Sequence, residues 1–324
     1  MPDTPLVSIL MCAYNAGDYL SPALQSVLSQ SWPNFEVVVI DDGSTDGSIG
    51  TAPELSDKRV RLVRQENTGR PIALNRGLAL CRGELIAFQD ADDLAEPTRI
   101  ANQAAVMRDE PDLVAAFCGH YLLIGDRRVA PRYPAKDRVA CATDIEAFHM
   151  PAHDPTGMWR KSLIAGETYD PDLRIAHAVD YITRLGERYP MRVVGEPLYG
   201  YRVHVSSLTQ TDPKRRMHEL DTIFRRACAR RGVDPEALGG EARNVGKTGK
   251  RRNKDNNLAG HFIESVHEQR DRGLRGSAIW SALRCSLLAP VDAHYQKALA
   301  YALMPEFLRQ RLRGRAARNS LVAH

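Results

Sequence analysis

Residues 83–97, GELIAFQDADDLAEP, decide how this chain folds. Their apolar run, residues 85–88, has the length and composition of a strand that is buried on both faces of a parallel sheet. The run leads into Asp90, Asp92 and Asp93. Because ligands bind such sheets at the carboxyl ends of the strands, we expect these carboxylates to lie at the binding edge of an α/β sheet.

Carboxylates as close as these three repel one another unless a cation lies between them. Oxygen ligands on a short turn suit Mg²⁺ or Mn²⁺, and a divalent ion held in this way usually also binds a substrate phosphate. The alternative is a solvated acidic turn ahead of a helix that begins near Glu96. Because the apolar strand brings the cluster to a binding edge, we predict a divalent metal site.

Size and composition indicate a globular protein. The chain has 324 residues, 43% of them hydrophobic, which is enough for one large α/β domain and an appendage. No apolar run approaches the ~18 residues of a membrane span, and the start, MPDTPLVSIL, lacks the features of a signal peptide. We therefore expect a cytoplasmic protein. The six cysteines have no CxxC or zinc-site spacing, which indicates reduced and mostly buried thiols.

Charge is divided unequally along the chain, although the net formal charge is only +4. Residues 1–212 carry 21 Lys and Arg against 29 Asp and Glu, a net charge of −8. Residues 213–324 carry 23 against 11, a net charge of +12. This division predicts two regions with different partners.

Strand and helix patterns alternate along the first hundred residues. We predict strands at residues 6–12, 35–40, 60–63 and 85–88, with a helix after the first strand and another at residues 72–80. The alternation predicts a mostly parallel central sheet with flanking helices, as in a Rossmann-like half domain. The second strand ends in DDGSTDG, residues 41–47, which places a second acidic loop on the same edge.

The remaining signals are weaker. We expect a helix after Pro97, a strand at residues 113–118, a hairpin around Gly125 and Asp126, irregular loops over residues 131–176, a helix that carries Asp180, and a strand at residues 191–194. The loops are rich in Pro, His and Asp, as expected of loops that close over a site. Beyond Asp212 the segments are basic and helical.

Seven motifs occur in a fixed order along residues 6–209. They are AYN (13–15), DDGSTDG (41–47), NTGRPIALNRG (67–77), QDADD (89–93), DPTGMW (154–159), AVDYITRL (178–185) and YRVHVSSLT (201–209). As an ordered set they resemble the nucleotide-sugar-dependent glycosyltransferases of family 2, an inverting group with the GT-A fold. The resemblance does not cover the last third of the chain.

The resemblance implies a donor site. Asp42 would contact the nucleotide base, with Tyr14 close to it, and Arg70 would contact donor phosphate or base. Asp90-Ala91-Asp92 would be the DxD motif, with Asp92 the direct metal ligand and Asp90 nearer the ribose. From the residues alone, Asp42 is also a candidate helix cap, Tyr14 a core residue and Arg70 a solvated side chain.

The resemblance also implies a catalytic base and a third metal ligand. Asp180 matches the base that must take the proton of an attacking hydroxyl, while the metal offsets charge on the departing diphosphate. Val179 stands where the family often has a second acid, so Asp180 is also a candidate first-turn helix acid. His204 matches a metal or phosphate ligand of some relatives, although a lone His is commonly a polar loop residue. Arg202 is a further candidate for the diphosphate.

These observations favour an inverting glycosyltransferase that uses a divalent Mn²⁺ or Mg²⁺ ion and a nucleoside-diphosphate-sugar, with a UDP-sugar expected first. The acceptor would be a glycan or lipid-linked hydroxyl in bacterial surface polysaccharide synthesis. The predicted domains are a GT-A catalytic domain at residues 1–212 (donor binding at about 1–100, acceptor binding at about 101–212) and a basic helical C-terminal extension at residues 213–324.

Three alternatives belong to other classes. A nucleotidyltransferase needs a Gly-rich basic loop after the first strand, and AYNAGDYL is not one; a dehydrogenase needs GxGxxG, which follows no strand here. A non-catalytic scaffold that binds nucleic acid is disfavoured because the carboxylates are kept and the basic tail lacks interleaved aromatic residues. We expect the tail to contact an anionic membrane on its inner face, or else to pack on the catalytic domain as a helical cap.

Overall fold

The computed structural model describes residues 4–124, 127–129, 135–202, 212–236, 279, 282, 283, 303 and 304. The chain divides into two compact units, one formed by residues 1–128 and 133–248 and the other by residues 129–132 and 249–324. The elements described below lie in the first unit, apart from the last residue of β7. Among the helices that the structure describes, none has both the length and the hydropathy of a membrane span.

The element order confirms the predicted α/β fold. The strands are β1 (Val7–Ala13), β2 (Phe35–Asp41), β3 (Val60–Arg64), β4 (Leu85–Asp90), β5 (Leu94–Ala95), β6 (Ala115–Ile124), β7 (Arg127–Val129), β8 (Gly157–Arg160) and β9 (Met191–Arg202). The helices are α1 (Leu20–Leu28), α2 (Ser48–Thr51), α3 (Arg70–Leu80), α4 (Arg99–Asp109), α5 (Arg138–Glu146), α6 (His177–Gly186) and α7 (Pro213–Arg231), with 3-10 turns η1 (Gly17–Tyr19), η2 (Pro53–Ser56) and η3 (Asp154–Thr156).

The described strands form one nine-stranded sheet with the order β3-β2-β1-β4-β8-β6-β9-β5, and β7 pairs with β6. β1 to β4 pair in parallel, as predicted for the Rossmann-like half. Beyond β4 the sheet is mixed, because β8 runs antiparallel to both β4 and β6, whereas β6 and β9 are parallel. The register aligns the carboxyl ends of the first strands, since Ala13 lies opposite Asp41 and Cys12 opposite Asp90.

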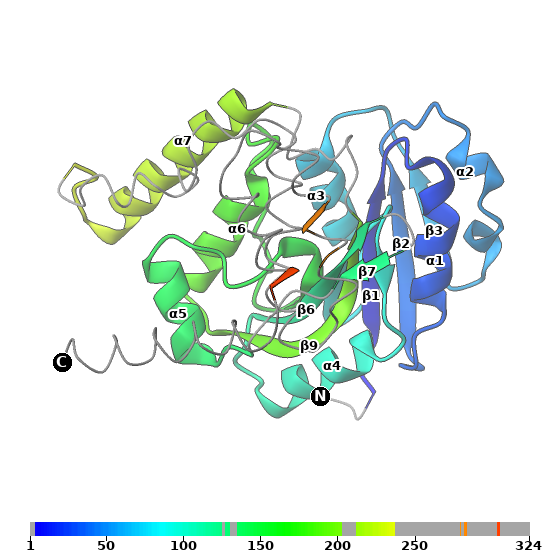
Figure 1. Ribbon diagram of the computed structural model, residues 1–324, viewed down its shortest axis with the longest axis horizontal. Coiled ribbons are helices and arrows are strands. Elements are labelled where there is room, and N and C mark those ends of the chain that lie inside the picture. Colours follow the sequence, from blue (N-terminus) through cyan, green and yellow to red (C-terminus); the bar gives the residue numbers. More distant parts are fainter. Residues whose placement is uncertain are drawn as a thin grey trace. The chain divides into compact units, whose positions relative to one another are not determined.

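Helices cover both faces of the parallel half (Figure 1). Side chains of α1 and α4 pack with Ile9 and Met11 on one face, and side chains of α3 and α6 pack with Leu10 on the other. The approach of α3 to β1 is close: a Cβ atom on Gly77 would lie 2.2 Å from Cδ1 of Leu10. Gly77 is therefore required by packing.

The prediction of irregular loops over residues 131–176 was wrong in part, because α5, η3 and β8 lie within them. β8 has only four residues and is fully buried, so it shows no alternation that would reveal a strand. β6 and β7 flank the predicted hairpin, whose residues Gly125 and Asp126 lie outside the described residues. The cysteines that the structure describes are buried and free: Cys12, Cys81, Cys118, Cys141 and Cys228.

The first helix of the basic segment, α7, packs on α6 and the loop before it. Leu220 and Ile223 are buried against Leu173 and Ala176. The carboxylate of Glu219 accepts hydrogen bonds from the backbone N–H groups of residues 174, 175 and 176, at 3.1, 2.8 and 2.8 Å. The contacts of α7 match the expected alternative of a helical cap that packs on the catalytic domain.

A buried arginine joins the two halves of the sheet. Arg99 is fully buried at the start of α4, and its Nη2 donates to the carbonyl oxygens of Phe88 and Pro155, each at 2.8 Å. Its Nη1 donates to Oε1 of Gln89 at 3.0 Å, and its guanidinium stacks 4.8 Å from the ring centre of Tyr199. These bonds hold β4, η3 and β9 together next to the carboxylates that follow β4.

We predict that Arg99→Met lowers the free energy of unfolding by at least about 3 kcal/mol, because several buried acceptors lose their donor and each costs about 1–3 kcal/mol. Urea unfolding measures the change. Arg108→Met on the same helix is the control, since Arg108 is half exposed and pairs with its neighbour Asp109; its loss should stay within about 0.5 kcal/mol. Equal effects of the two substitutions would contradict the role of Arg99.

Candidate active site

The loops after β1 and β2 are bonded together into one surface at the carboxyl edge of the sheet. Oδ1 of Asn15 accepts from the backbone N–H of Thr45 at 2.8 Å, and the N–H of Asn15 donates to Oγ of Ser44 at 3.1 Å. Oδ2 of Asp46 accepts from the N–H of Gly17 at 2.8 Å. The AYN and DDGSTDG motifs therefore shape a single rigid platform.

Asp42 anchors the loop that leads into α3. Its carboxylate is buried and accepts from the backbone N–H groups of Thr68 and Gly69, both at 2.9 Å, and from Nε2 of Gln65 at 2.7 Å. Gly69 has a φ of 94°, which favours glycine and turns the chain into the helix. The Asp42 carboxylate thus holds the NTGRP segment against the platform.

Tyr14 lies on the same platform with 53% of its surface exposed, so it is not a core residue. An exposed aromatic ring is suited to stacking on a planar ligand.

The three carboxylates of QDADD come together at the end of β4. One ligand oxygen from each of Asp90, Asp92 and Asp93 lies within 4.8 Å of the others. The backbone N–H of Asp90 donates to the hydroxyl of Tyr199 at 3.0 Å, which fixes the turn. Oxygen-only ligands at this spacing match what Mg²⁺ and Mn²⁺ bind.

Asp93 is the buried member of the cluster. Its Oδ1 accepts from the backbone N–H of Arg202 at 2.7 Å, whereas its Oδ2 is buried and has no hydrogen-bond partner among the described residues. Burial, followed by the charges of Asp92 and Asp90, raises the pKa of Asp93 well above its usual value. A buried carboxylate oxygen without a hydrogen-bond partner among the described residues, beside two further carboxylates, fits a bound cation.

Two arginines lie against the cluster. Arg70, the first residue of α3, forms an ion pair with Asp90. Burial, the largest single effect, opposes the charge of Arg70, but the Asp90 carboxylate together with the other nearby groups raises the pKa of the guanidinium. Nε of Arg202 donates to the carbonyl oxygen of Asp92 at 2.8 Å, and its guanidinium stacks 4.6 Å from the ring centre of Tyr19. His204 lies outside the described residues.

Asp154, at the start of η3, is a candidate that sequence reasoning missed. Its carboxyl group is buried, and its Oδ1 has no hydrogen-bond partner among the described residues. Burial raises its pKa to about 7, although the Arg70 charge opposes the rise; the Asp90 charge adds to it. In the sequence, only the DPTGMW motif drew attention to this segment. A single Asp before a Pro does not indicate that its carboxyl group will be buried or which residues will surround it.

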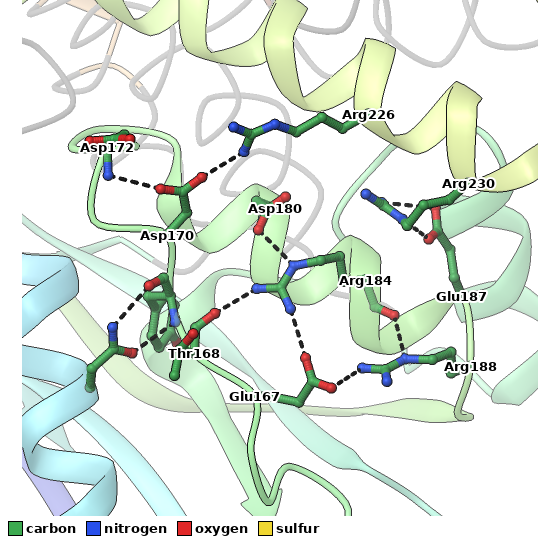
Figure 2. Close-up of polar contacts among 12 residues, drawn as sticks. Glu167, Thr168, Asp170, Asp172, Asp180, Arg184, Glu187, Arg188, Arg226 and Arg230 are labelled. Carbon is green, nitrogen blue, oxygen red and sulfur yellow. Dashed lines mark hydrogen bonds and ion pairs between the residues drawn. The ribbon is translucent and has the colours of Figure 1, made fainter.

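Asp180 is buried in the first turn of α6, and its Oδ2 accepts from Nε of Arg184 at 2.7 Å. Figure 2 shows that Arg184 also bonds to the Glu167 carboxylate and to the Thr168 carbonyl oxygen, each at 2.7 Å. His177, one turn earlier, is buried, and burial followed by the Arg70 charge lowers its pKa to about 3. The positive charge of Arg70 therefore also acts on His177 at the start of α6.

A cavity of about 800 Å³ lies at the other end of α6, lined by charged side chains that include Arg188, Arg230 and Glu187. Its arginines pair with its glutamates, as Arg230 does with Glu187 at 2.7 Å. The acidic cluster does not line this cavity, so we place the chemistry at the cluster.

Comparisons with known proteins identify the family of the chain. A family model described as glycosyl transferase family 2 matches residues 8–150. An uncharacterized glycosyltransferase of Haemophilus influenzae is 31% identical over 223 residues, which cover 63% of this chain and 67% of that protein. This chain spans about two thirds of the length of the curated relatives that it matches.

Two solved structures share the fold. The structure of S. aureus TarS 1-349 in complex with UDP has a TM-score of 0.57 at 17% identity and covers 91% of this chain and 88% of that one. The mannosyltransferase PcManGT from Pyrobaculum calidifontis, in complex with GDP-Man and Mn²⁺, has a TM-score of 0.55 at 19% identity and covers 93% and 85%. The fold is thus the GT-A fold, and the chain belongs to glycosyltransferase family 2.

Proposed function

We propose that the protein transfers a sugar from a nucleoside-diphosphate-sugar to an acceptor hydroxyl, with inversion at the anomeric carbon. The observation that carries the proposal is the convergence of Asp90, Asp92 and Asp93 beside the platform of the first two loops. TarS and PcManGT, which share the fold, bind UDP, UDP-GlcNAc or GDP-Man. A UDP-sugar is the first donor to test.

The donor nucleotide would occupy the platform. Tyr14 offers an exposed ring for the base, and Asp42 holds the loop from which Arg70 would reach the diphosphate. An arginine at the start of a helix suits a phosphate, since the guanidinium donates to two oxygens and the helix dipole adds positive potential.

Asp90 and Asp92 would hold a Mn²⁺ or Mg²⁺ ion, with Asp93 and His204 as further candidate ligands. When bound, such an ion offsets the negative charge that develops on the departing diphosphate. Asp93 fits the site because it contributes an oxygen to the cluster and its buried Oδ2 has no hydrogen-bond partner among the described residues.

Asp180 is proposed as the base that takes the proton of the acceptor hydroxyl. Arg184 binds its Oδ2 and fixes the carboxylate, which leaves Oδ1 as the proposed acceptor of the proton. A carboxylate on α6 and a cation at the end of β4 would serve the two charges that develop at opposite ends of the reaction. This separation suits a single displacement, in which attack and departure occur on opposite sides of the sugar.

The acceptor is proposed to be a growing glycan or a lipid-linked sugar of a bacterial surface polysaccharide. The +12 charge of residues 213–324 supports contact with an anionic membrane on its cytoplasmic face. Helix α7 of this segment packs on α6. We therefore propose that residues beyond α7 make the membrane contact.

Asp92→Asn should weaken Mn²⁺-dependent UDP binding at least about 10-fold, because it removes a ligand charge from the metal site. Isothermal titration of UDP with and without Mn²⁺ measures the effect. Asp109→Asn, an exposed carboxylate on α4, is the control for net charge. Unchanged UDP binding by the Asp92 variant, or full sugar transfer in excess chelator, would exclude the metal assignment.

Asp180→Asn should lower the transfer rate by roughly 10² to 10⁴-fold while donor affinity stays near normal, because only the proton acceptor is lost. Steady-state kinetics and donor titration separate the two effects. NMR of the product should show the anomeric configuration opposite to that of the donor.

Glu167→Gln is the matched control, since Glu167 pairs with the same Arg184 as Asp180 does. If the two variants lose activity equally, Asp180 acts only by positioning Arg184. A parental rate in Asp180→Asn, or a retained anomeric configuration, would refute the assignment as base.

A further inference from the structure

Arg70 is the ion-pair partner of Asp90, one of the proposed metal ligands. Its guanidinium pairs with Oδ1 of Asp90, and the two side chains are only 25% and 19% exposed. The backbone ahead of it is held in place, because the N–H groups of Thr68 and Gly69 bond to the Asp42 carboxylate. The start of α3 is therefore fixed, so a change of partner by Arg70 would need a movement of its side chain alone.

Two arginines lie against the three carboxylates, and within the described part of the chain only Arg70 is seen to form an ion pair with Asp90. Asp90, Asp92 and Asp93 converge within 4.8 Å, and Arg70 supplies one positive charge at Asp90. The other arginine, Arg202, gives its Nε–H to a carbonyl oxygen and its backbone N–H to Asp93. A divalent ion would compete with Arg70 for the negative charge of Asp90, because the two cations repel each other and the ion pair already offsets that charge.

A donor diphosphate would remove this competition. Guanidinium groups bind phosphate oxygens through two parallel N–H bonds, so an incoming diphosphate offers Arg70 a partner at least as good as Asp90. Asp90 is then available to the metal, which the same diphosphate also binds.

We propose that Arg70 is a counter-ion switch: without donor it neutralises Asp90 and weakens binding of a divalent ion, and with donor it moves to the diphosphate and frees Asp90 for the metal. This inference rests on the proposed function. It makes metal and donor binding cooperative, and by linkage each ligand raises affinity for the other by the same factor. The site would then stay largely free of metal until a donor arrives.

The test is the affinity for Mn²⁺ alone, measured by electron paramagnetic resonance and by calorimetry on the full chain. Arg70→Met removes the charge and keeps the length of the side chain, so Mn²⁺ alone should bind this variant at least about 5-fold more tightly than the parent, the lower end of typical coupling factors. Saturating UDP should tighten Mn²⁺ binding strongly in the parent and much less in the variant.

Arg76→Met is the matched control. Arg76 lies on the same helix and donates to Arg64 and Gln65 rather than to the cluster, so this variant has the same net charge as Arg70→Met. Its Mn²⁺ affinity should equal that of the parent. Arg70→Gln repeats the test with a side chain that keeps a donor but no charge, in case the methionine variant does not fold.

The outcomes separate the two proposals. If the parent binds both Mn²⁺ and UDP but Arg70→Met and Arg70→Gln bind Mn²⁺ alone no more tightly, the switch is wrong and the proposed function stands. If the parent binds neither Mn²⁺ nor UDP, both fail. Equal tightening in Arg70→Met and Arg76→Met would reduce the effect to net charge and would also overturn the switch.

Discussion

Repulsion among Asp90, Asp92 and Asp93 is the constraint on which the rest of the site depends. Three carboxylates with oxygens within 4.8 Å are tolerated only where cations and N–H groups surround them. The surroundings meet this need from distant parts of the chain: Arg70 from α3 and the Arg202 backbone from β9. The fold brings both to the end of β4, and we propose that a divalent metal offsets the remaining repulsion.

The mixed half of the sheet serves to hold that cluster in place. β8 pairs antiparallel with β4, and η3 just ahead of it is tied to Phe88 through Arg99. Tyr199 on β9 accepts the N–H of Asp90 while its ring stacks on the same arginine. Contacts with β8, with Arg99 and with Tyr199 thereby hold the end of β4 and the turn that follows it. The carboxylates of this turn are therefore positioned without a ligand, which is the preorganisation that binding and catalysis require.

The sequence predicted what is encoded locally. Apolar runs marked β1, β2 and β4, and the polar residues at their ends placed Asp42 and the QDADD cluster on one edge. It did not predict the Arg70–Asp90 pair, the burial of Asp93, or the position of Asp154, because each depends on contacts between residues distant in sequence. The surroundings of Asp180 were predictable only in part. Arg184 follows Asp180 at the helical i+4 spacing, so this partner could be foreseen from the sequence. Glu167, which is distant in sequence, contacts Arg184 only because of the fold.

We propose that the acidic cluster at the end of β4 is a metal-dependent site for a nucleotide-sugar. A panel of UDP-, GDP- and dTDP-sugars, each with Mn²⁺ or with EDTA, tests it most directly through the thermal unfolding midpoint of the protein. The account predicts that at least one donor raises the midpoint by several degrees with Mn²⁺ and much less with EDTA, since a ligand at 100 times its Kd adds about 2.7 kcal/mol of stability. Stabilisation that is equal in EDTA, or absent with every donor, would contradict it.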